Sequence, residues 1–94
     1  MLTAEQNKIY RTFYDSIKQN DILDPKATHM IHIAAAMALG CYPWMREYFS
    51  VTEKLGITRK ELSAVQAIVM AVAAGKVNAQ SLDARASMRK NKKK

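Results

Sequence analysis

The residues best suited to chemistry lie where one predicted helix ends and the next begins, over residues 39–44. An apolar helix stops at Gly40, and Cys41 comes two residues before Pro43, which opens the following helix. Free backbone amides and the positive end of the helix dipole stabilise a thiolate at such a position. Cys41 is therefore a candidate nucleophile. The alternative interpretation is that Cys41 fills a tight turn as a small apolar side chain, since free cysteines are often buried and inert.

Two histidines precede this junction at a spacing that metal sites also use. His29 and His32 are three residues apart and share one side of a helix, and with Cys41 they would make three ligands. No acidic residue accompanies them, and histidine pairs on helices are common without a metal. We therefore expect no metal ion and no cofactor. Because the chain has a single cysteine, an intrachain disulfide is excluded.

Helical periodicity and capping signals dominate the sequence, whereas strand patterns are nearly absent. Three helix starts are marked, by the Thr3–Gln6 capping box, the Asp24-Pro25 pair and the Thr58–Glu61 capping box. Helix ends are expected at Gly40, Gly56 and Gly75. We predict an all-α bundle of four to five helices, over residues 3–19, 25–39, 43–55 and 58–74, with a weaker pattern over 78–88.

The chain contains more apolar material than a small monomer can easily bury. Of its 94 residues, 49% are hydrophobic, and the segment from Met30 to Leu39 is apolar nearly all round, broken only by His32. A helix without a polar face is buried on most sides. In a domain of this size, part of that burial must come from neighbouring subunits, so we predict a homo-oligomer. The alanine-rich turns of residues 64–74 are a second candidate contact surface.

The formal net charge of +7 is concentrated at the C-terminus. Residues 85–94 contain six basic residues and no acidic one, which leaves a net charge of +1 for the rest of the chain. We expect residues 1–84 to form a single helical domain and residues 85–94 to form a disordered basic tail. No aromatic residues interleave with the basic ones, so the tail carries no signal for specific nucleic-acid binding.

Signals for export or membrane insertion are not visible. The N-terminus lacks a charged start followed by an apolar stretch, and the longest apolar run, Ile33 to Cys41, is far shorter than the ~20 residues of a membrane helix. We expect a cytoplasmic protein without membrane contact.

Three stretches together resemble a known family. They are Leu23-Asp24-Pro25-Lys26, Ala38-Leu39-Gly40-Cys41 and Leu55-Gly56-Ile57-Thr58-Arg59-Lys60-Glu61-Leu62. Their order and caps resemble the alkylhydroperoxidase-D-like, or carboxymuconolactone decarboxylase, family over roughly residues 22–80. That family's pattern is an acidic residue on a long helix, then Gly-Cys-x-x-Cys, a His four residues later, and Gly-x-(Thr/Ser)-x-x-Glu opening the next helix. The resemblance implies an all-α fold and homo-oligomers, commonly trimers or hexamers.

The family's functional positions are only partly retained. The first cysteine of the motif is present as Cys41, but the second falls on Trp44 and the family histidine falls on Tyr48. The acidic residue falls on His29. The resemblance implies that these four side chains line one pocket. The disulfide cycle of the peroxidase members needs two thiols, which one chain with only Cys41 cannot supply.

Two hypotheses for function follow. The first is a protein of this family with thiol-based redox activity, in which Cys41 is catalytic, His29 and Tyr48 handle protons, and Trp44 contacts a small-molecule ligand or a peroxide. The second is a non-enzymatic helical oligomer, a scaffold or small-ligand pocket in which Trp44 and Tyr48 contact the ligand. In both, the expected partner is the chain itself, as a homotrimer or homohexamer. Binding of nucleic acid through the tail is a third hypothesis, which we do not favour.

Overall fold

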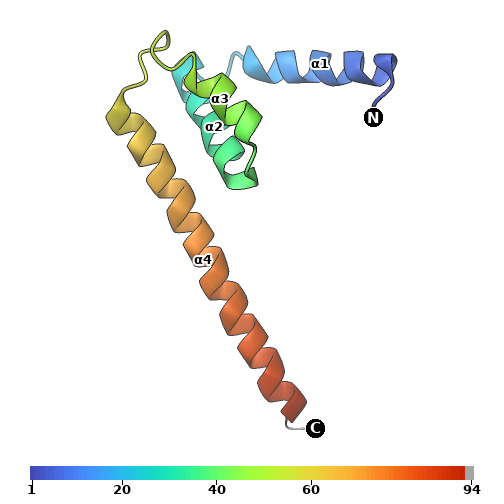
Figure 1. The fold of residues 1–94 in the computed structure, drawn as a ribbon, viewed down its shortest axis with the longest axis vertical. Coiled ribbons are helices and arrows are strands. Elements are labelled where there is room, and N and C mark those ends of the chain that lie inside the picture. Colours follow the sequence, from blue (N-terminus) through green and yellow to red (C-terminus); the bar gives the residue numbers. More distant parts are fainter. Residues whose placement is uncertain (93–94) are drawn as a thin grey trace.

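The computed structural model describes residues 1–92, which contain four helices and no strands (Figure 1). The helices are α1 (Ala4–Lys18), α2 (Pro25–Leu39), α3 (Tyr42–Phe49) and α4 (Arg59–Lys92). The predicted all-α class is confirmed.

The three helix starts marked by capping signals are confirmed by their caps. The Thr3 hydroxyl accepts a hydrogen bond from the Gln6 amide at 3.1 Å, and the Thr3 amide donates to the Gln6 side chain at 2.9 Å. The carboxylate of Asp24 accepts from the Ala27 amide at 2.8 Å. The Thr58–Glu61 capping box is also formed at the start of α4. These bonds satisfy amides that the first turn of a helix leaves without a backbone partner.

The small core lies around α2, which contacts both α3 and α4. Ile33 on α2 is fully buried, and Ala36 and Tyr48 pack with it. Partly buried apolar side chains surround these three, among them Cys41. α2 ends at Gly40, whose φ of +69° lies in the left-handed region, as the predicted glycine stop requires. This turn leads directly from the core helix into α3.

The third helix is shorter than the sequence predicted. α3 ends at Phe49, and residues 50–56 form turns instead of continuing the helix to Leu55. The Ser50 hydroxyl donates to the Glu47 carbonyl at 2.6 Å, and the Thr52 hydroxyl donates to the Phe49 carbonyl at 3.0 Å. Such side-chain bonds compete with the helical backbone pattern, which explains the early end.

The fourth helix is longer than predicted, because Gly75 does not end it. α4 is one helix of 34 residues that absorbs the separate helix expected over residues 78–88. Gly75 has no positive φ, and a helical glycine costs only about 1 kcal/mol relative to alanine. The strong helix formers on both sides of Gly75 therefore carry the helix through it.

The expected disordered tail also differs from the structure. Residues 85–92 are the last turns of α4, and residues 93–94 lie outside the described part of the chain. No glycine or proline occurs between Lys76 and Lys92, and alanine, arginine and lysine are frequent there. These residues have high helix propensity, so basic charge by itself does not stop the helix.

The arrangement of the helices is open. α1 projects to one side and α4 runs far past α2 and α3 (Figure 1). The radius of gyration is 18.7 Å, whereas a compact chain of this length would have about 12 Å. α1 has no buried residue, and Ile9 and Phe13 on it are 64% and 62% exposed.

Candidate functional site

Cys41 lies at the wall of an open cavity between the end of α2 and the start of α3. The cavity has a volume of about 320 Å³ and is lined by His32, Ala35, Ala36, Leu39, Cys41, Trp44 and Tyr48. Cys41 is a free, partly exposed cysteine and is the residue immediately before α3, as the sequence predicted. Its side chain makes no capping hydrogen bond. The thiol therefore combines access to a cavity with the positive end of a helix.

Stacked aromatic rings form one wall of this cavity. The rings of Trp44 and Tyr48 on α3 are stacked, with centroids 5.6 Å apart and planes at 22°. The ring of Tyr14, from α1, lies 5.1 Å from that of Trp44. Trp44 is 38% exposed, whereas Tyr48 is only 6% exposed. The wall is aromatic and mostly apolar, and it suits an organic ligand better than a small hydrophilic one.

The hydroxyl of Tyr48 is paired with the hydroxyl of Tyr14. Burial, and then the hydrogen bond with Tyr14, raise the pKa of Tyr48 well above its ordinary value of 10. Its phenol therefore stays protonated at neutral pH. Tyr48 can therefore donate a hydrogen bond, but its raised pKa makes it a weak acid, and it is not a base under these conditions.

His32 is the histidine that shares the cavity with Cys41. Its Nδ1 lies 2.8 Å from the Thr28 carbonyl oxygen, and since a carbonyl can only accept, Nδ1 donates there. The neutral ring then has Nε2 as its proton acceptor. The sequence indicated His32 as half of a possible metal pair and as the polar break in an apolar helix, and not as a neighbour of Cys41. The missed signal is spacing, because residues 32, 35, 36 and 39 follow one face of α2 toward Cys41.

His29 occupies a different place. It is 7% exposed, and its Nε2 lies 2.7 Å from the backbone carbonyl oxygen of Tyr48. Its ring meets the Tyr48 ring edge-on, with centroids 5.3 Å apart. It lines a separate cavity of about 160 Å³, which His32 and Tyr48 also border. Of the four predicted site residues, the structure thus brings Cys41, Trp44 and Tyr48 to one cavity and places His29 beside it.

Metal ligands do not gather at this site. Within residues 1–92 no group of three or more His, Cys, Asp or Glu side chains is placed to hold a metal ion. The two histidines each use one ring nitrogen to bond a backbone carbonyl. What the site offers chemically is a thiol, an imidazole and a protonated phenol on an apolar cavity.

Comparison with known proteins identifies a family whose model covers most of the chain. The model of the carboxymuconolactone decarboxylase family matches residues 5–86, a stretch that includes the whole cavity around Cys41. No curated protein and no solved structure matches the chain.

Proposed function

Because the chain belongs to the carboxymuconolactone decarboxylase family, we propose that it is a thiol peroxidase of that family that works with one cysteine. Cys41 is the peroxide-reacting residue, and the substrate is a small organic hydroperoxide. The chain has no second cysteine, so the thiol is regenerated by an external thiol and not by a disulfide within the chain.

The observation that carries this proposal is the position of Cys41. A vestigial cysteine would be sealed in the core, whereas Cys41 is partly exposed and lines an open cavity of about 320 Å³. It also precedes α3 directly, at the positive end of that helix. A peroxide must reach the sulfur to oxidise it, and the open cavity gives that access.

The proposed cycle balances without a cofactor. The Cys41 thiolate attacks the outer oxygen of the hydroperoxide, the O–O bond breaks, and the alcohol leaves after taking up one proton. Cys41 is then a sulfenic acid. One external thiol converts it to a mixed disulfide with loss of water, and a second external thiol releases the Cys41 thiol and an external disulfide.

Two neighbours can serve the proton transfers. His32 lines the same cavity as Cys41 and, as a neutral ring, has Nε2 as a proton acceptor. Tyr48, held protonated by burial and by Tyr14, can stabilise the leaving oxygen by a hydrogen bond, while the proton that the alcohol takes up comes from His32 or from solvent. His29 acts through Tyr48, whose backbone carbonyl it bonds.

The test measures consumption of cumene hydroperoxide by the full chain with dithiothreitol as the external thiol. We expect turnover that Cys41→Ser abolishes and that His32→Ala slows on the order of a hundredfold. His29→Ala should slow turnover much less at temperatures where the variant is folded. If wild-type Cys41 resists iodoacetamide until the protein is unfolded, the proposed peroxidase is excluded.

A second candidate function is ligand binding without catalysis. It is favoured by Trp44 and Tyr48, which stack where the family pattern has a cysteine and a histidine and which form an apolar wall. Trp44 is the only tryptophan of the chain, so its fluorescence reports directly on the cavity. Quenching by an apolar ligand that is equal in wild type and Cys41→Ser, without peroxide turnover, would favour this function over the first.

A further inference from the structure

A polar cavity of about 340 Å³, the α1 cavity, lies between α1 and Trp44. Trp44 also lines the cavity of Cys41, so the two cavities share this side chain as a common wall. Cys41 and Trp44 are three residues apart at the start of α3, which corresponds to a rise of about 4.5 Å along a helix. A molecule bound against Trp44 in the α1 cavity therefore contacts a residue that is less than one helical turn from Cys41.

The α1 cavity carries charges of both signs. Arg11, Asp15 and Lys18 line it, and their spacing of four and three residues places them on one side of α1. All three are exposed. Within residues 1–92 the only ion pair joins Lys26 to Glu61, so the three charges of the cavity are not paired with one another. They are available to a ligand that brings charges of its own.

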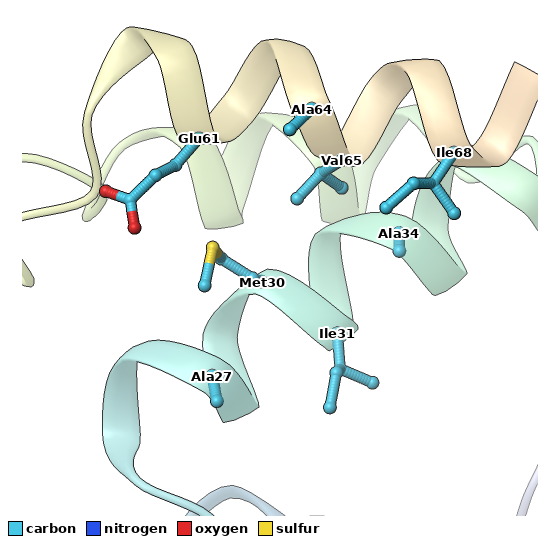
Figure 2. Close-up of a pocket in the computed structure, with 8 residues that line it drawn as sticks. All are labelled: Ala27, Met30, Ile31, Ala34, Glu61, Ala64, Val65 and Ile68. Carbon is cyan, nitrogen blue, oxygen red and sulfur yellow. The ribbon is translucent and has the colours of Figure 1, made fainter.

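Two other cavities lack this combination of charges. The cavity of Cys41 is mostly apolar, and it suits the hydrocarbon body of an organic hydroperoxide. Figure 2 shows the hollow between α2 and α4, where Glu61 lies at one end among apolar side chains. Glu61 is the only charged residue of that lining, and it is paired with Lys26. The two reactants of the peroxidase cycle thus find cavities of different chemistry on the two sides that Trp44 lines.

We propose that the α1 cavity binds the external thiol, and that this thiol carries the ammonium and carboxylate groups of an α-amino acid. Arg11 and Lys18 bind the carboxylate by charge-assisted hydrogen bonds, and Asp15 binds the ammonium group. A thiol without an ammonium group would place its carboxylate beside that of Asp15 without compensation. The redox role of this ligand rests on the proposed function, whereas its binding does not.

The thiol arm of such a ligand can pass Trp44 to reach Cys41. A tripeptide spans about 10 Å when extended, and Trp44 is 38% exposed. The bound thiol attacks the sulfur of the Cys41 sulfenic acid, the S–O bond breaks, and the hydroxyl leaves as water with the proton of the thiol. A second thiol then attacks the mixed disulfide, which restores the Cys41 thiol and releases the disulfide of the two external thiols.

The binding test uses the full chain and S-methylglutathione, which has the amino-acid end of the proposed ligand but no reactive thiol. The readout is the fluorescence of Trp44, the only tryptophan of the chain. Arg11→Gln and Lys18→Gln should each weaken binding on the order of tenfold, the effect of one charge-assisted hydrogen bond. Lys8→Gln is the matched control, since Lys8 is an exposed lysine of α1 that does not line the α1 cavity.

Asp15→Asn separates recognition of an amino acid from binding of any anion. This variant should weaken binding of S-methylglutathione on the order of tenfold. It should strengthen binding of 3-(methylthio)propionate, which has a carboxylate and no ammonium group, because the repulsion from Asp15 is removed. Stronger binding of both compounds would show that the cavity accepts anions in general, and the assignment to an amino acid would be wrong.

Turnover of cumene hydroperoxide tests the redox role. Lys18→Gln should raise the KM for glutathione on the order of tenfold relative to the KM for uncharged dithiothreitol, and Lys8→Gln should leave this ratio unchanged. Equal affinities of wild type, Arg11→Gln and Lys8→Gln for S-methylglutathione, or no saturable change in fluorescence, would overturn the proposal even if dithiothreitol supports turnover. Binding that Arg11→Gln weakens, without turnover by either thiol, would contradict the peroxidase and support the ligand site alone.

Discussion

At the scale of single residues, Tyr48 connects the parts of the site. Its hydroxyl is bonded to Tyr14 of α1, its backbone carbonyl accepts from His29 of α2, and its ring stacks on Trp44. The ring of His32 lies 5.2 Å from it. One buried side chain thus links three helices, and its contacts hold the wall of the cavity next to Cys41. A change at Tyr48 would alter the site and the packing of the helices together.

The hydrogen bond between Tyr14 and Tyr48 can be tested by Tyr14→Phe. The variant keeps the ring contact but leaves the buried Tyr48 hydroxyl without that partner, which should lower the free energy of unfolding by about 1–3 kcal/mol. The variant also removes the hydrogen bond with Tyr14, which is one of the causes that raise the pKa of Tyr48. Ultraviolet titration should therefore give a lower pKa for Tyr48 in the variant than in wild type. Tyr10→Phe is the control for stability, because Tyr10 is 47% exposed on the same helix. Equal urea midpoints for both variants would contradict this role.

At the scale of helices, Glu61 joins the start of α4 to α2. Its carboxylate accepts from the backbone amide of Thr58 at 2.9 Å and lies 2.9 Å from the Nζ of Lys26. The bond from the Thr58 amide, and then the contact with Lys26, lower the pKa of Glu61 from 4.5 to about 2. A carboxyl whose folded pKa is depressed stabilises the fold above its unfolded pKa, and this contribution is lost as the pH falls toward the folded value.

We therefore expect Glu61→Gln to lower the thermal midpoint at pH 7. The difference from wild type should shrink as the pH falls below 4.5, be small near pH 2, where wild-type Glu61 is about half protonated, and vanish only below that pH. Lys26→Met removes only the ion pair and should have a smaller effect, since the capping bonds remain. A difference between Glu61→Gln and wild type that is the same at every pH would show that charge is not the cause.

Alanine substitutions at two glycines should change the stability of the protein in opposite directions. Gly75 lies inside α4 without a positive φ, and an added Cβ would meet open space. Gly75→Ala should therefore stabilise the protein by about 0.5–1 kcal/mol. Gly40 has a φ of +69°, so Gly40→Ala should destabilise it by about 1–2 kcal/mol. Thermal unfolding followed by circular dichroism measures both, and stabilisation by Gly40→Ala would contradict the left-handed turn.

At the scale of the whole molecule, the exposed apolar surface has a thermodynamic consequence. The chain exposes 8202 Å², including large side chains on all four helices. Association couples to folding by mass action, so the thermal midpoint of an oligomer rises with protein concentration. We expect such a rise over a hundredfold range of concentration by differential scanning fluorimetry. A midpoint independent of concentration would indicate that folding does not depend on association.

The starts of the helices could be predicted from the sequence because capping is local. Thr3 with Gln6, Asp24, and Thr58 with Glu61 bond amides only a few residues away, so their effect is visible in the order of residues. The ends were less predictable. Whether Gly75 stops a helix depends on its neighbours on both sides, and the end of α3 depends on which carbonyls Ser50 and Thr52 bond.

The sequence by itself determined the helical class and the place of Cys41 before a helix, since both depend on residues close together in the chain. It also carried the family resemblance, in three short stretches whose order and spacing are visible without the fold. Only the tertiary structure decided which side chains meet Cys41. His32 lines the cavity of Cys41, whereas His29 donates a hydrogen bond to the Tyr48 carbonyl. Tyr14, which bonds the Tyr48 hydroxyl, lies on α1 and precedes Tyr48 by 34 residues. Such neighbours depend on how α1 and α3 pack on α2, and packing depends on contacts between residues that sequence spacing does not relate.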